Sequence, residues 1–283
     1  MRLGSTRQSR QQAGDSGIAQ GAAVETMQTI AVNRQYRGLR QIHRDPDIFT
    51  IDNFFDKKTC EAFLTVGLRG EKDGSAKRVS SKVFGSGLSA GRIFQGALAA
   101  TASALVPALR EMSSLGQARK STTWFLNYGR AAPLVRSVLS LLPDARLENC
   151  EEPQVVRYKT GDYFDWHEDA LPPQQARRPT NGGQRVGTVL VYLNDMGARE
   201  GGATEFRDLP VSISPVQGKA VLFFPAFADG TPDPRTVHAG KPVTGANSKW
   251  IAQLWIHQGR YVPSVPPGNS HTDFTRSGGG LLF

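Results

Sequence analysis

Short apolar runs separated by turn residues dominate the second half of the chain. Each run has the length of a β-strand and is bounded by Gly, Asn, Asp or Pro. Regularly spaced runs of this kind are typical of antiparallel strands in a sandwich or barrel. The pattern therefore predicts a β-rich core over residues 151–262, built from the segments PQVVRY, RVGTVLVYL, GGATEF, VSISPV, KAVLFFP and KWIAQLWI.

The region before this core contains patterns typical of helices. Ile48–Ile51 alternates like a short strand, and the apolar positions after it have helical spacing, with Asp52 or Asn53 as the cap. Residues 96–112 and 132–143 also have helical spacing, and a proline breaks or ends each of them. We therefore expect an α+β protein in which N-terminal helices support the β core.

The two ends of the chain differ in composition from the rest. Residues 1–44 hold seven arginines against two acidic residues and are rich in Gln, Gly, Ser and Ala. Such a segment buries too little apolar surface to fold, so we expect a disordered basic leader. Residues 263–283 are rich in Pro, Ser and Gly, and we expect a flexible tail there. A helical supporting region at 45–150 then lies between the leader and the core at 151–262.

Charge and cysteine content narrow the class of protein. The net charge is +9, and the leader supplies +5 of it, which is seven arginines minus two acids. No groove-reading motif accompanies this charge, so we do not expect a nucleic-acid partner.

No apolar run approaches the roughly 18 residues of a membrane span. The two cysteines form no CxxC pair and indicate reduced thiols. We expect a cytoplasmic location, with organelle targeting by the leader as the alternative.

The five histidines are unequal candidates for chemistry. His43 lies at the edge of the leader and His271 in the tail, where we expect neither to be held rigidly. His257 ends the run WIAQLWIH, and we expect it to be a surface residue at the end of a strand. His167 and His238 remain, both inside the β-rich region.

The segment YKTGDYFDWHEDA places His167 and Asp169 two residues apart. Alternate side chains of a strand share a face, so the imidazole and the carboxylate can hold one ion, while Glu168 and Trp166 point away. With His238 from a distant strand, the set becomes two histidines and one carboxylate, which is associated with non-haem Fe(II) oxygenases. Zinc with a bound water is the competing interpretation of the same ligands.

Lys249 lies at the start of a predicted strand, eleven residues after His238. Taken alone, it reads as a surface lysine. Inside a barrel beside a metal, however, a lysine is costly to bury without an anionic partner. Together with the three metal-ligand candidates, a buried cation favours a substrate that carries a carboxylate.

Several segments in a fixed order resemble prolyl 4-hydroxylase-type 2-oxoglutarate- and Fe(II)-dependent dioxygenases. The resemblance extends from residue 47 to residue 257, about three quarters of the chain. It implies a double-stranded β-helix, or jelly roll. The matching segments are IDNFFDKKTCEAFL, RKSTTWFL, ENCEEPQVVRYKTGDYFDWHEDA, GGQRVGTVLVYLNDMGAREGGATEF, VQGKAVLFF and VHAGKPVTGANSKWIAQLWIH.

The resemblance also implies roles for individual residues. His167, Asp169 and His238 correspond to the iron ligands, and Lys249 to the partner of the far carboxylate of 2-oxoglutarate. Three further residues correspond to positions that line the cosubstrate pocket: Tyr158, Tyr192 and Thr188. Tyr158 reads equally well as a core aromatic, and Arg185 as a contact of either substrate or solvent.

Three features depart from the family pattern. The family commonly has an acidic residue at Ala203 and a cysteine at Lys241. The loop through GANS makes the spacing from His238 to Lys249 one residue longer than usual. The three ligand positions are unchanged.

The implied activity is 4-hydroxylation of a peptidyl proline with O₂. Decarboxylation of 2-oxoglutarate gives succinate and CO₂, and ascorbate keeps the iron reduced. The loops at 68–92 and 171–183 are candidate substrate lids, and Arg177 and Arg178 in the second loop favour an acidic peptide. Alternatives are hydroxylation of a free amino acid or other small molecule, oxidation of nucleic acid, a zinc hydrolase, and a non-catalytic binding module that keeps the fold.

Overall fold

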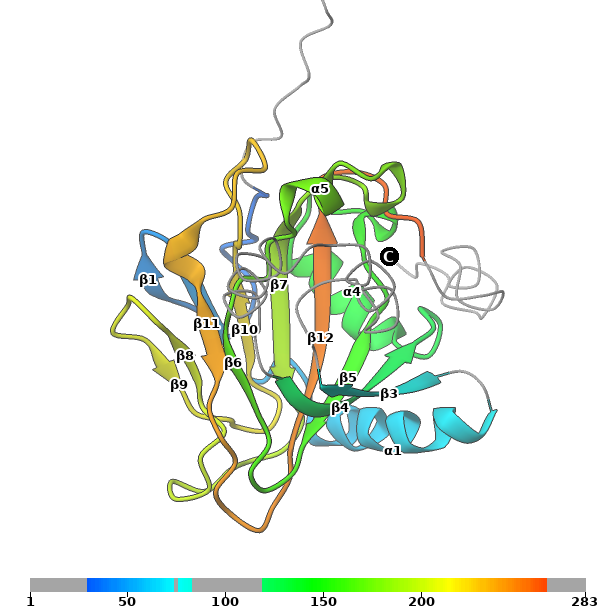
Figure 1. Cartoon of the computed structure of the whole chain (residues 1–283), viewed down its shortest axis with the longest axis vertical. Helices are drawn as coiled ribbons and strands as arrows, with labels where there is room; N and C mark the ends of the chain where they lie inside the picture. The colour runs from blue at the N-terminus through cyan, green and yellow to red at the C-terminus, as the bar shows by residue number, and fades with distance from the viewer. Residues whose placement is uncertain (1–29, 74–75, 83–118, 264–283) are drawn as a thin grey trace, which may run out of the picture.

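The computed structural model describes residues 30–73, 76–82 and 119–263 (Figure 1). The predicted helix at 96–112, the first 29 residues of the predicted leader and most of the predicted tail lie outside these ranges. Within them, the strands form one antiparallel sheet that curls over on itself.

Twelve strands of the described residues belong to this sheet. Their bounds are β1 (Leu39–Arg44), β2 (Asp47–Ile51), β3 (Ala76–Lys82), β4 (Arg119–Leu126), β5 (Gln154–Tyr158), β6 (Tyr163–His167), β7 (Arg185–Tyr192), β8 (Thr204–Phe206), β9 (Ser212–Ile213), β10 (Ala220–Phe223), β11 (His238–Gly240) and β12 (Lys249–His257). Every one of the six predicted strand runs contains one of them, so the predicted β core is confirmed.

Strand order explains how the sheet encloses a site. One layer runs β1-β2-β10-β7-β12-β5-β4, and the continuation β6-β11-β8-β9 folds over it. Strand β4 connects the two layers because it pairs with both β5 and β6. The result is the predicted jelly-roll core, with β6, β11 and β8 facing β7 and β12 (Figure 1).

Alternation along the strands divides the interior into two cores. In β7, Val189 and Val191 face the outer core, whereas Leu190 and Tyr192 face the inner core between the layers. The helices α1 (Lys57–Asp73) and α4 (Ala132–Leu141) cover the outer core (Figure 1). Both faces of β7 are therefore buried, which explains its nearly continuous apolar sequence.

Several boundaries differ from the sequence predictions. Helix α4 confirms the helix predicted at 132–143, but α1 begins at Lys57 rather than after Asp52 or Asn53. Its cap is Asp56, whose Oδ1 accepts a hydrogen bond from the Thr59 N–H at 2.7 Å. Asn53 instead adopts a left-handed backbone with φ 54° and turns the chain before the helix.

Two predicted irregular segments contain regular structure. Residues 39–44 of the predicted leader form β1, which pairs with β2. In the predicted loop at 68–92, residues 68–73 continue α1 and residues 76–82 form β3. The supporting region before the core therefore supplies strands as well as helices to the structure.

Candidate metal centre and cavity

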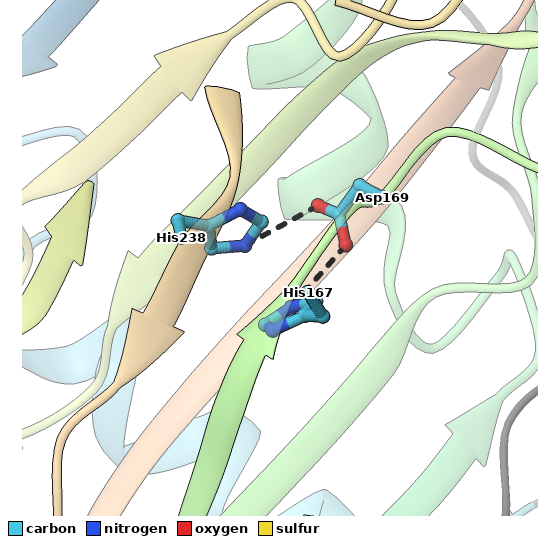
Figure 2. A group of neighbouring side chains, drawn as sticks. All are labelled: His167, Asp169 and His238. Atoms are coloured by element: carbon cyan, nitrogen blue, oxygen red, sulfur yellow. Dashed lines mark ion pairs between the residues drawn. The ribbon is translucent and has the colours of Figure 1, made fainter. Parts of the chain in front are cut away.

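Strand register brings the two candidate histidines together. His167 is the last residue of β6 and His238 the first of β11, and these two residues are direct partners in the antiparallel pairing. Their ring centroids lie 4.1 Å apart. Asp169 completes the group, with Oδ1 3.6 Å from His167 Nε2 and Oδ2 3.8 Å from His238 Nε2 (Figure 2). All three side chains are buried.

Asp169 lies beyond the end of β6, so the prediction that it shares a regular strand with His167 is wrong in detail. Two contacts hold it in place instead. The Thr188 hydroxyl donates to Asp169 Oδ2 at 2.8 Å. Arg185 Nη1 lies 3.4 Å from the Asp169 backbone carbonyl. The carboxylate therefore faces the imidazoles through contacts with β7 rather than through strand geometry.

The hydrogen bonds of the two imidazoles leave Nε2 available for a metal. His167 Nδ1 lies 2.7 Å from the Asp165 carbonyl, and His238 Nδ1 lies 3.0 Å from the Thr236 carbonyl. A carbonyl oxygen only accepts, so each Nδ1 carries the proton and each Nε2 presents a lone pair. This is the usual way in which metal-ligating histidines are oriented.

Protonation states in the cluster also suit a metal. Burial, together with the neighbouring His238, lowers the pKa of His167 to about 3. Burial alone would raise the pKa of the Asp169 carboxyl, but the two imidazoles hold that pKa below its usual range. A neutral imidazole and an ionised carboxylate are the forms that ligate metals. Two nitrogens and one carboxylate fit Fe(II) and leave further coordination positions for ligands.

A cavity between the two sheet layers opens beside this cluster. His167, Asp169 and His238 form part of its wall, and further residues of β5, β6, β7, β8, β11 and β12 form the rest. Lys249 also lines it and is only 2% exposed. The longer loop before β12 therefore leaves Lys249 inside the cavity.

Lys249 is a buried cation without a matching anion. Among the described residues, no acidic side chain forms an ion pair with it. Its Nζ instead lies 5.4 Å from the Tyr158 ring centroid and 5.5 Å from that of Tyr192. Burial lowers the pKa of its ammonium to about 7. An anionic group that entered the cavity would remove this cost, since it would pair with the ammonium.

The predicted cosubstrate-pocket residues have different surroundings. Tyr158 lines the cavity and also packs in the inner core, and its role toward a cosubstrate stays a prediction. Thr188 lines the cavity while it holds Asp169. Tyr192 is fully buried behind the wall, where its hydroxyl donates to Thr204 Oγ1 at 2.7 Å. Tyr192 therefore shapes the pocket through Thr204 and the aromatic contact with Lys249.

His257 is not the surface residue that its place at a strand end predicts. Only 1% of it is exposed, and its Nε2 lies 2.9 Å from Glu151 Oε2. Glu151 also receives two bonds of 2.7 Å from Arg185, whose guanidinium lies 3.7 Å from the Trp255 ring centroid. Burial would raise the pKa of Glu151, but Arg185 and His257 lower it to about 2. The network therefore carries an ionised carboxylate next to the cavity wall.

The remaining sequence-level candidates lie away from the cavity. Lys241 pairs with Glu205 at 3.5 Å and lies over the Trp166 ring, so its difference from the family pattern affects the outside of β11. Glu168 is exposed, as predicted. His43 is held in β1, where its Nδ1 lies 2.8 Å from the Pro46 carbonyl.

The two candidate lids are not established by the described structure. The segment at 171–183 contains α5 (Pro173–Ala176) and the 3₁₀ turn η2 (Pro179–Asn181), with Arg177 and Arg178 exposed. In the other segment, residues 83–92 lie outside the described ranges. A role for either segment as a lid stays a prediction.

Part of the cavity wall is formed by residues outside the set predicted from the sequence. Ile251, Gln253 and Trp255 line it together with Lys249, at intervals of two residues along β12. Strand periodicity from Lys249 contained this signal. Thr204 and Gly240 also line the cavity. No local pattern marks these two residues, because long-range pairing of β8 with β11 brings them there.

Comparison with known proteins agrees with this geometry. Residues 153–257 match the sequence model of the 2OG-Fe(II) oxygenase superfamily. Prolyl 4-hydroxylase 2 of Arabidopsis thaliana is 30% identical over 189 residues, which cover 58% of this chain and 61% of the relative. Prolyl 4-hydroxylase subunit alpha-1 of Homo sapiens is 35% identical over 114 residues, which cover 40% of this chain and 21% of the relative. The chain thus spans less than two thirds of either curated relative.

One solved structure has the same fold over most of its length. The viral collagen prolyl hydroxylase from Paramecium Bursaria Chlorella virus-1, in its 2OG complex, is 25% identical with a TM-score of 0.50. The alignment covers 76% of this chain and 96% of that chain. Within the part of the chain that the structure describes, no helix is long and apolar enough to cross a membrane.

Proposed function

We propose that this chain, whose residues 153–257 form a 2OG-Fe(II) oxygenase domain of the prolyl 4-hydroxylase type, hydroxylates proline residues of a peptide substrate. The reaction would consume O₂ and 2-oxoglutarate. One oxygen atom enters the C–H bond of the substrate and the other enters succinate, and CO₂ is released. Ascorbate would serve as the reductant that keeps the iron in its Fe(II) state.

One observation carries this proposal. The two-histidine, one-carboxylate cluster and an unpaired buried lysine line the same cavity. A zinc hydrolase would use the cluster but leaves Lys249 without a role. A cosubstrate with a carboxylate at each end uses both features, because one end can reach the metal while the other pairs with the ammonium.

The residues of the chain have separable tasks in this scheme. His167, Asp169 and His238 would hold Fe(II), which supplies the activation of O₂ when it is bound. Lys249 would bind the far carboxylate of 2-oxoglutarate. Leu190 and Ile251 contribute apolar wall that excludes water from the reacting atoms. Thr188 fixes the Asp169 carboxylate through its hydroxyl.

The buried phenols keep the surroundings of Lys249 free of negative charge. Burial raises the pKa of Tyr158 and that of Tyr192, so both hydroxyls remain protonated at neutral pH. The cavity can therefore receive the carboxylate of 2-oxoglutarate without competition from a phenolate.

The proposal is tested with purified protein, Fe(II), 2-oxoglutarate and ascorbate. A proline-rich peptide is compared with the same peptide in which alanine replaces proline. We expect succinate release that rises with the proline peptide, together with a gain of 16 mass units on that peptide alone. Amino-acid analysis should identify 4-hydroxyproline. Coupled turnover with a free amino acid and none with peptides would instead support the small-molecule alternative, and no turnover at all would contradict the dioxygenase assignment.

A further inference from the structure

A buried glutamine just before β7 bonds to the chain that follows Asp169. Gln184 is 2% exposed. Its Oε1 accepts from the Leu171 N–H at 2.5 Å and from the Arg185 N–H at 2.9 Å. Its Nε2 donates to the Leu171 carbonyl at 2.9 Å. Both backbone groups of Leu171 are therefore satisfied by one side chain.

This contact replaces a strand partner that the Leu171 backbone lacks. The segment from Asp169 to Leu171 is buried but lies outside β6 and precedes α5. Buried backbone groups need hydrogen-bond partners, and an unpaired one destabilises the folded state. The Gln184 amide supplies those partners from a residue thirteen positions away.

The backbone of Gln184 ties this segment to the lysine-bearing strand. Its N–H donates to Gln258 Oε1, and its carbonyl accepts from the Gln258 N–H, both at 3.0 Å. Gln258 directly follows β12, the strand that begins at Lys249. Gln184 thus links the chain after Asp169 to the β7–β12 pair.

We propose that Gln184 is a positioning residue for the metal centre, whose amide holds the Asp169–Leu171 segment so that the Asp169 carboxylate meets both imidazoles. This inference rests on the metal site proposed above. Three residues then hold the Asp169 segment in place, two of them in β7 and one directly before it. Thr188 fixes the carboxylate, Arg185 contacts the Asp169 carbonyl, and Gln184 fixes the backbone two residues later.

The test compares two shortened amides. In Gln184→Asn the side chain loses one methylene group and no longer reaches both backbone groups of Leu171. Gln217→Asn is the matched control, because Gln217 Nε2 also donates to a backbone carbonyl, that of Leu193, at the opposite end of β7. Loss of a hydrogen bond to a metal ligand itself typically weakens metal binding about 10- to 100-fold. Gln184 bonds to Leu171 rather than to Asp169, so we expect the lower end of that range.

Mn(II) is the probe, and its affinity is measured by the electron paramagnetic resonance signal of the free ion, without turnover. We expect Gln184→Asn to bind Mn(II) at least ten times more weakly than the unaltered protein, and Gln217→Asn to bind within about twofold of it. Equal affinity of Gln184→Asn and the unaltered protein overturns the inference. Equal weakening in both variants overturns it as well. Failure of the unaltered protein to bind Mn(II) is a different result, which counts against the proposed function itself.

If Gln184→Asn does not fold, hydrogen exchange of the unaltered protein decides the question. If the Gln184–Leu171 hydrogen bonds hold Asp169 in place, exchange of the Leu171 amide should slow when Mn(II) saturates the site. Breaking these bonds would then also displace Asp169 from the metal. Unchanged exchange at Leu171 in the presence of saturating Mn(II) contradicts the proposal.

Discussion

At the residue scale, the most informative side chain is Lys249. Burial disfavours its charged form, and within the described residues no carboxylate compensates it. A protein that only needed to fold would be more stable with an apolar residue at this position. An anionic ligand that pairs with the ammonium would offset the cost of burying it. The burial of Lys249 is therefore consistent with its proposed role in binding 2-oxoglutarate.

This reasoning predicts a pH dependence of 2-oxoglutarate binding. Burial lowers the pKa of Lys249 to about 7, so the ammonium is present below that pH and is lost as the pH rises through it. The facing groups are the Tyr158 and Tyr192 phenols, which stay neutral, and the three metal ligands share the cavity wall. Above about pH 7 the affinity should therefore fall roughly tenfold per pH unit, because each binding event must first restore the proton.

Calorimetric titration of the Mn(II)-saturated protein between about pH 6 and pH 8.5 measures this dependence. Lys249→Arg is the control, since a guanidinium stays charged throughout that range and its binding should be independent of pH. A flat profile for the unaltered protein, or the same slope in both proteins, would rule out titration of Lys249 as the cause.

At the element scale, the two faces of strand β12 have different roles: one lines the cavity and the other packs in the outer core. Lys249, Ile251 and Trp255 face the cavity, whereas Ala252 and Leu254 face the outer core under the helices. Substitutions at neighbouring residues of this strand should therefore affect different properties, either ligand binding together with stability or stability alone. The same alternation in β7 places Thr188 against Asp169 and Val189 in the outer core.

A pair of truncations on β12 tests this division. Ile251→Ala and Leu254→Ala each remove a buried aliphatic side chain and should each lower the free energy of unfolding by about 2–5 kcal/mol. Only Ile251→Ala alters the cavity wall beside Lys249, so we expect it alone to weaken 2-oxoglutarate binding several-fold. Urea unfolding and calorimetric titration measure the two quantities. Equal effects of both variants on binding would contradict the assignment of the faces.

At the scale of the whole molecule, much of the fold could be predicted because most strands bury at least one face. The six apolar runs of the core were recognisable, and each contains a strand. Strand β1 was missed because its sequence LRQIHR is mostly polar and half or more of it is exposed. It forms at an edge by pairing with β2, and a single sequence carries little signal for that contact.

The site could be predicted only as far as residue type and local spacing identify its members. His167, Asp169, His238 and Lys249 were found from residue type and spacing, and the structure brings them to one cavity. The environment of His257 could not be found in this way, because its partner Glu151 precedes it by 106 residues.

The start of α1 differs from the predicted one because several residues before α1 can cap a helix. The backbone of Asn53 turns the chain there instead.

The proposed dioxygenase reaction is tested by following the two atoms of O₂ into the products. The protein is incubated with Fe(II), 2-oxoglutarate, ascorbate and a proline-rich peptide under ¹⁸O₂, and both products are analysed by mass spectrometry. We expect one ¹⁸O atom in each succinate and one in each hydroxyproline, in equal amounts, with loss of both in Asp169→Ala. Hydroxyproline that carries oxygen only from water, or a peptide that stays unmodified while 2-oxoglutarate remains intact, would contradict the proposed reaction.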